Sequence, residues 1–123
     1  MQLLFVILTC LVALEHLGIA ALEIWGRPAQ QANAFGMPLS FIQQAPARAA
    51  LANQGIYNGM LAVVILGALL LLTGTAQHIT LALLLVFIVV VALFGSLTVK
   101  RQIFWLQGCP ALLTLLVLLV LGL

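Results

Sequence analysis

The sequence predicts an all-α membrane protein, a polytopic antiparallel bundle of four transmembrane helices, and three observations lead to this fold class. Of the 123 residues, 66% are hydrophobic and 5% are charged, whereas soluble domains carry about 25% charged residues. Four apolar segments each reach the ~20 residues that a membrane-spanning helix needs. Two of the three connections are short, which favours antiparallel neighbours. We therefore expect a single transmembrane domain over residues 1–123, surrounded by membrane lipids.

The four predicted helices cover residues 2–25, 46–72, 79–99 and 103–123. The third is rich in Val, Ile and Phe, which favour strands in water. A lone strand in lipid would leave its backbone groups without hydrogen bonds, so a helix is predicted there too. Pro46 suits the first turn of the second helix, where a missing N–H costs nothing. Pro110 predicts either a kink in the fourth helix or its start.

The connections differ in length. The first, residues 26–45, contains Gly26, Pro28, Gly36 and Pro38 and is predicted to be a loop, because these residues break regular structure. Its apolar stretch "MPLSFI" is expected at the membrane interface. The other two, "TGTAQH" at 73–78 and "KRQ" at 100–102, are predicted to be short loops.

The basic residues predict the topology. Arg27 and Arg48 are assigned to the first loop and Lys100 and Arg101 to the third, so all four basic residues fall on one side. The positive-inside rule places that side in the bacterial cytoplasm. Loops 26–45 and 100–102 are then cytoplasmic, and both termini lie outside the cytoplasmic membrane. A net charge of +2 without a long basic cluster gives no indication of nucleic-acid binding.

The first helix carries unexpected polar residues. Thr9, His16 and Glu23 recur every seven residues and form one stripe, while Glu15 lies ~100° round the helix from His16. A charged side chain at mid-bilayer costs at least ~2.5 kcal/mol. We therefore expect Glu15 to be neutral, to share a proton with His16, or to reach water.

The second helix has a polar face and, opposite to it, the pair Gly55 and Gly59. His16 and Asn58 both lie ~12 Å from the cytoplasmic boundary at 1.5 Å per residue. The fourth helix adds Gln107 on the same side of the membrane. We expect a polar pocket in the cytoplasmic half for ligand binding or proton coupling, lined by Glu15, His16, Glu23, Asn53, Gln54, Tyr57, Asn58 and Gln107.

Other readings of these residues stay open. Asn, Gln and Tyr on a membrane helix can serve only to hold helices together, and Glu23 can be an interfacial charge or pair with Arg27. Helical metal ligands favour i, i+3 or i, i+4 spacing, which the first helix lacks. No metal site and no cofactor are predicted. No serine or cysteine nucleophile accompanies His16 at a recognisable spacing, so whether the protein is an enzyme is left undecided.

Three stretches carry a family resemblance: "EHLGIAALEIW", "NQGIYNGMLA" and "GSLTVKRQIFWLQGCPALLTLL". They are similar to a family of small four-helix bacterial integral membrane proteins of unknown function, domain of unknown function 1304. The resemblance covers nearly the whole chain and implies four helices in one domain. It implies no activity.

Three functions therefore remain for an integral membrane protein of unknown specific function. The first is proton-linked binding or transport of a small solute. The layout of the chain resembles that of the small multidrug transporters. All basic residues fall on one side, however, which favours a self-contained bundle or a parallel homodimer over an antiparallel pair. The second is an intramembrane enzyme or a lipid- or quinone-binding protein. The third is a structural accessory subunit with a closed, dry core.

Overall fold

The computed structural model describes residues 1–122, and every regular element in that range is a helix. Four helices are long and apolar enough to cross a membrane. In chain order they are α1 (Gln2–Trp25), α4 (Ala45–Leu71), α5 (Gly74–Thr98) and the continuous pair η1 (Phe104–Gly108) and α6 (Cys109–Leu121). The predicted fold class is confirmed. The predicted end of the fourth helix, Leu123, falls outside the described residues.

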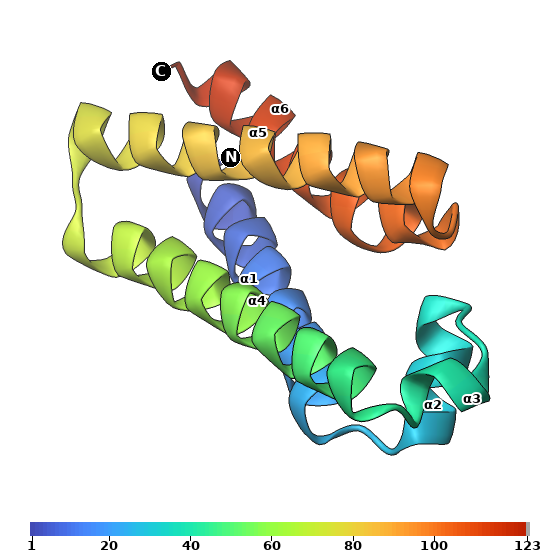
Figure 1. Cartoon of the computed structure of the whole chain (residues 1–123). Coiled ribbons are helices and arrows are strands. Elements are labelled where there is room, and N and C mark those ends of the chain that lie inside the picture. Colours follow the sequence, from blue (N-terminus) through green and yellow to red (C-terminus); the bar gives the residue numbers. More distant parts are fainter. Residues whose placement is uncertain (123) are drawn as a thin grey trace.

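The helices alternate in direction (Figure 1). One end of the bundle carries Arg27, Arg48, Lys100 and Arg101, and we call it the basic end. α1 packs most extensively against α4, and α5 packs against η1 and α6. By contrast, α4 and α5 have much less contact, and in Figure 1 they diverge from their short connection towards the basic end.

The connection at 26–45 is more ordered than the sequence suggested. It contains α2 (Pro28–Phe35) and the single-turn α3 (Leu39–Ile42). Pro28 stands in the first turn of α2, and Gly36 follows its last turn with φ +66°, in the left-handed region that favours glycine. The helix-breaking residues Pro28 and Gly36 therefore mark the two ends of a short helix.

The prediction of a loop at 73–78 is wrong, because α5 begins at Gly74 and only Leu72 and Thr73 separate it from α4. The Gln77 side chain gives the physical reason. Its Nε2 donates to the carbonyl oxygens of Leu69 and Leu72, each at 2.7 Å. These bonds satisfy carbonyls that the end of α4 leaves free, and they hold the first turn of α5 against it.

The fourth spanning segment begins with a π-helical turn. The Cys109 N–H bonds to the Phe104 carbonyl, five residues earlier. Pro110 follows in the first turn of α6 and has no N–H to give to an α-helical ladder. The predicted effect of Pro110 is thus found as a helix start preceded by a π turn, the kind of irregularity often seen at functional sites.

The apolar core lies in the half of the bundle away from the basic end. Lipid tails are as apolar as leucine, so close packing rather than burial from water holds these helices together. All four spanning helices contribute to it, with Phe5, Val12, Ala13, Ala62, Ile65, Ala68, Leu81, Leu85, Ile88, Ala111, Val117 and Leu118. The other half is where the predicted polar residues gather.

Candidate functional site

The polar stripe of α1 faces the bundle. Thr9, His16 and Glu23 are all buried. Two of the three bond to the backbone of their own helix: Thr9 Oγ1 donates to the Phe5 carbonyl at 2.8 Å, and His16 Nδ1 to the Val12 carbonyl at 2.8 Å. The bond of His16 uses one ring nitrogen and leaves the other available.

Glu23 is the residue of the stripe that binds another spanning helix. Asn58 on α4 donates from Nδ2 to Glu23 Oε2 at 2.8 Å. Arg27, the alternative partner considered for Glu23, instead bonds Gln30 within α2. Glu23 therefore holds α1 to α4 from a position that is 6% exposed.

Gln31 supports this contact, and the sequence reasoning missed it. Gln31 is buried on α2, and its Nε2 donates to the carbonyls of Leu22 and Glu23, both at 2.9 Å. Arg48 in turn donates to Gln31 Oε1 at 3.2 Å. The glutamine thus bonds carbonyls in the last turn of α1, of which Leu22 also accepts the Gly26 N–H. The signal that would have found it is the Pro28 to Gly36 frame, which is typical of a short helix.

Glu15 is placed differently from the other predicted residues. It is half-buried, and its Oε1 is buried without a hydrogen-bond partner within residues 1–122. No hydrogen bond in that range joins Glu15 to His16, and Glu15 does not line the pocket described next. The sharing of a proton between these two residues stays a prediction.

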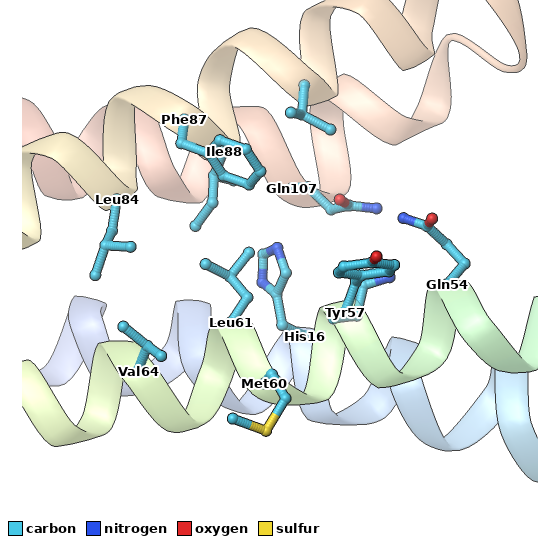
Figure 2. A pocket seen from close by; sticks show the side chains of 12 residues that line it. His16, Gln54, Tyr57, Met60, Leu61, Val64, Leu84, Phe87, Ile88 and Gln107 are labelled. Atoms are coloured by element: carbon cyan, nitrogen blue, oxygen red, sulfur yellow. The ribbon is translucent and has the colours of Figure 1, made fainter.

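A cavity of about 290 Å³ lies between α4 and α5, with α1 and η1 behind it (Figure 2). The volume is at the small end of the range of about 300–1,000 Å³ for ligand pockets. Five of the eight predicted site residues line it: His16, Gln54, Tyr57, Asn58 and Gln107. Asn53 is exposed on α4 and is not part of the lining. The structure therefore brings together polar groups from α1, α4 and η1.

The rest of the cavity wall is apolar. It consists of Met60, Leu61, Val64, Leu84, Phe87, Ile88 and Val91. Figure 2 shows the amides of Gln54 and Gln107 facing each other at one end, with Leu84 and Val64 at the other. The α5 wall could not be predicted from the sequence, because its side chains are of the same type as those that face lipid.

The cavity opens sideways. Tyr57 is 66% exposed and Phe87 is 54% exposed, and both lie in the central turns of their helices. The exposed surface at the middle of a spanning helix faces hydrocarbon. The exposed rim of the cavity therefore lies at mid-helix, between α4 and α5.

The chemistry of the lining is uncharged hydrogen bonding. No Lys, Arg, Asp or Glu is among the lining residues. The described part of the chain holds no group of three or more His, Cys, Asp or Glu residues that would suit a metal ion. The pocket offers hydrogen bonds at one end and apolar contact along the remainder.

Comparisons with known proteins give a family and one relative. Residues 10–119 match a family model described as "Protein of unknown function (DUF1304)". Over 117 residues, 94% of this chain and 97% of the relative, the chain is 35% identical to "Uncharacterized protein YpaA" of Lactococcus lactis subsp. lactis (strain IL1403). No solved structure matches.

Proposed function

This chain belongs to the DUF1304 family of proteins of unknown function, and from the geometry of its site we propose that it binds an uncharged amphiphile from the bilayer. The observation that carries the proposal is the division of the sideways-opening cavity into a polar end and an apolar wall. An amphiphile would place its head among Gln54, Tyr57 and Gln107 and extend its chain along the apolar wall towards Leu84 and Val64.

The polar end supports binding over a purely structural role. Within residues 1–122, no side-chain hydrogen bond joins Gln54, Tyr57 or Gln107 to another residue. Polar groups that serve only to hold membrane helices together bond across the helix interface, as Asn58 does to Glu23. Three polar side chains at one cavity end are instead free to hold a ligand.

The test uses a long-chain alcohol that carries a photoreactive diazirine in its chain. The protein is reconstituted in lipid nanodiscs, irradiated with the probe and digested, and the labelled residues are located by mass spectrometry. We expect saturable labelling on residues 57–64 and 84–91, which unlabelled 1-dodecanol competes away. Labelling that is spread over all lipid-facing surfaces and does not saturate would overturn the proposal.

The matched control removes only the polar end of the pocket. The double variant Gln54→Leu/Gln107→Leu keeps side chains of similar size and loses both amides. Its labelling of 57–64 and 84–91 is expected to fall to that of the general lipid-facing surface. Circular dichroism and gel filtration check that the variant retains its fold.

Proton-linked transport of a small solute is the second candidate, and one observation favours it. An ionisable residue within a membrane helix is most often functional, and the Glu15 Oε1 atom is buried without a partner in the described chain. Solute-driven proton uptake into proteoliposomes, present in the wild type and lost in Glu15→Gln, would support it. Equal uptake in both proteins would exclude Glu15 from any such role.

A further inference from the structure

We propose that the head of the bound amphiphile is a neutral hydroxyl group, which donates its hydrogen to Nε2 of His16. This inference rests on the proposed function and makes it more specific. It starts from one hydrogen bond inside α1, continues through the chemistry of the imidazole ring, and ends with the other groups at the polar end of the cavity.

The bond between His16 Nδ1 and the Val12 carbonyl, 2.8 Å long, determines where the ring carries its proton. A carbonyl oxygen can only accept a hydrogen bond, so Nδ1 must be the donor. A neutral imidazole has one N–H, and the other nitrogen is then an acceptor. Nε2 of His16 therefore presents a lone pair.

The neutral form is the one that suits this position. His16 is 2% exposed, and a cation in the membrane interior is costly. No carboxylate lines the cavity, and within residues 1–122 neither Glu15 nor Glu23 forms a hydrogen bond with the His16 ring. The ring thus has no anionic partner that would stabilise an imidazolium.

The free nitrogen is reached from the cavity. Figure 2 shows the His16 ring projecting from α1 into the space between α4 and α5, beside Leu61 and close to Tyr57. The described chain gives Nε2 no hydrogen-bond partner. Ligand binding would remove water from it, so a ligand without a donor would leave a buried acceptor unpaired.

The neighbouring Asn58 strengthens the preference. Its Nδ2 donates one of its two hydrogens to Glu23, and its Oδ1 is an acceptor without a hydrogen-bond partner in the described chain. The Tyr57 hydroxyl and the amides of Gln54 and Gln107 can donate or accept. His16 Nε2, which can only accept, lies beside groups that can donate or accept, and this combination favours a head that has a hydrogen to give and an oxygen to accept with.

The absence of charged side chains among the lining residues limits the head further. A phosphate or carboxylate head would lack a cation to pair with and would lose its hydration on entry. The ligand class that fits is an uncharged hydroxyl-bearing lipid, such as a long-chain alcohol, a monoacylglycerol or a quinol.

The test compares two probes of nearly equal size, 1-dodecanol and its methyl ether, 1-methoxydodecane. The ether keeps the oxygen and loses the hydrogen. We expect the alcohol to bind roughly tenfold to a hundredfold more tightly, since a ligand without the donor leaves the acceptor of His16 unpaired. Native mass spectrometry of nanodisc-embedded protein gives both affinities.

The nitrogen itself is observed by ¹⁵N NMR of protein labelled at histidine. The chain has two histidines, and the second, His78, lies in the first turns of α5 with its ring against Phe5, outside the cavity lining. We expect His16 Nε2 to resonate as an unprotonated nitrogen and to shift on addition of 1-dodecanol but not of the ether. His78 should not move with either probe.

The outcomes separate the two proposals. Binding of neither probe would overturn the proposed function. Equal binding of both, or a protonated Nε2 in the free protein, would overturn only the hydroxyl assignment. In His16→Gln the amide can donate as well as accept, so the preference for the alcohol should shrink to less than about threefold.

Discussion

The two sides of α4, one towards α1 and one towards α5, contact their neighbouring helices in opposite ways. Towards α1, Gly55 lies so close that a Cβ atom added there would be 2.6 Å from Ile24 Cγ1 and 3.1 Å from the Ala20 carbonyl oxygen. The Asn58–Glu23 bond crosses the same interface at 2.8 Å. Small residues and a polar pair are the two devices that hold membrane helices together, and the α1–α4 interface uses both.

Towards α5, Gln77 bonds the Leu69 carbonyl near the short connection, but neither device is present along the cavity. The facing side chains include Val64, Leu84, Phe87 and Val91, and a cavity of about 290 Å³ remains between the helices. In lipid, bulky apolar side chains have little reason to prefer each other over acyl chains. One side of α4 therefore packs closely against α1, and the other borders the cavity in which we propose that a molecule from the bilayer binds.

The largest expected effect comes from breaking the polar pair of the closed interface. Asn58→Leu would leave the buried Glu23 carboxyl without its donor, and the free energy of unfolding should fall by about 2–3 kcal/mol. Unfolding in sodium dodecyl sulfate, followed by circular dichroism, measures the change.

The control for this variant removes both partners. Since replacing both members of a hydrogen-bonded pair by apolar groups is nearly neutral, Glu23→Leu/Asn58→Leu should stay within about 1 kcal/mol of the wild type. A double variant as unstable as Asn58→Leu alone would show that the pair is not what joins α1 to α4.

The second effect concerns the small residues. Gly55→Ala introduces a methyl group into a space that lacks room for it, at 3.1 Å from the backbone of Ala20 and from Glu23 Cβ. The expected loss of stability is about 1–3 kcal/mol, the usual effect of overpacking. The same unfolding assay applies.

Gly59 offers a matched control one turn away. A Cβ there would meet only Ala20 Cβ at 3.6 Å, an ordinary contact. Because alanine favours helices over glycine by about 1 kcal/mol, Gly59→Ala should be neutral or stabilising. Equal destabilisation by the two variants would contradict the close approach at Gly55.

These two interfaces also show which features of the structure can be predicted from the sequence. The apolar segments and their lengths predict the spanning helices, since only closed hydrogen-bonding satisfies a backbone in lipid. α1 ends at Trp25 as predicted. The start of α5 was placed five residues late, because the polar stretch that contains Gln77 has loop-like composition, and its role depends on carbonyls in another helix.

Five of the eight residues predicted for the site line one cavity, and their role stays a prediction. Seven-residue spacing on α1 and the polar face of α4 identify side chains that the structure brings to one cavity, among them His16, Gln54 and Tyr57. The partner of Glu23 and the placement of Glu15 depend on how α1 is rotated against its neighbours, which spacing alone does not determine. The residue type of an apolar side chain such as Phe87 does not show whether it faces lipid or a pocket.

The third prediction concerns a larger side chain placed in the cavity between α4 and α5. Val91 lines the cavity and is 46% exposed. Its neighbour Val90 is 59% exposed and does not line this cavity. Val91→Trp should weaken the binding of 1-dodecanol by roughly tenfold or more, because the indole takes up ligand space. Val90→Trp, with the same change in side chain, should bind as the wild type does. Equal affinities of the two variants would place the ligand elsewhere.

The smallest effect is expected at the basic end, where one side chain links the two sides of the open interface. Lys100 follows α5, and its Nζ donates to the carbonyls of Asn33 at 3.1 Å and Ala34 at 3.4 Å, at the end of α2. A cation at a helix C-terminus is favourable, but this bond is exposed and screened by water. Lys100→Gln should therefore lower the free energy of unfolding by only about 0–1 kcal/mol.

Lys100→Gln should change the rates of hydrogen exchange and of ligand dissociation more than the free energy of unfolding. Because α2 is joined to α1, loss of the link removes one contact between α5 and the α1–α4 pair at the basic end. Both hydrogen exchange in α2 and dissociation of 1-dodecanol should then become faster. Arg101→Gln is the matched control, since it removes the same charge from an exposed neighbour that forms no hydrogen bond in the described chain. If both variants accelerate exchange equally, net charge is the cause and Lys100 does not link the two sides of the interface.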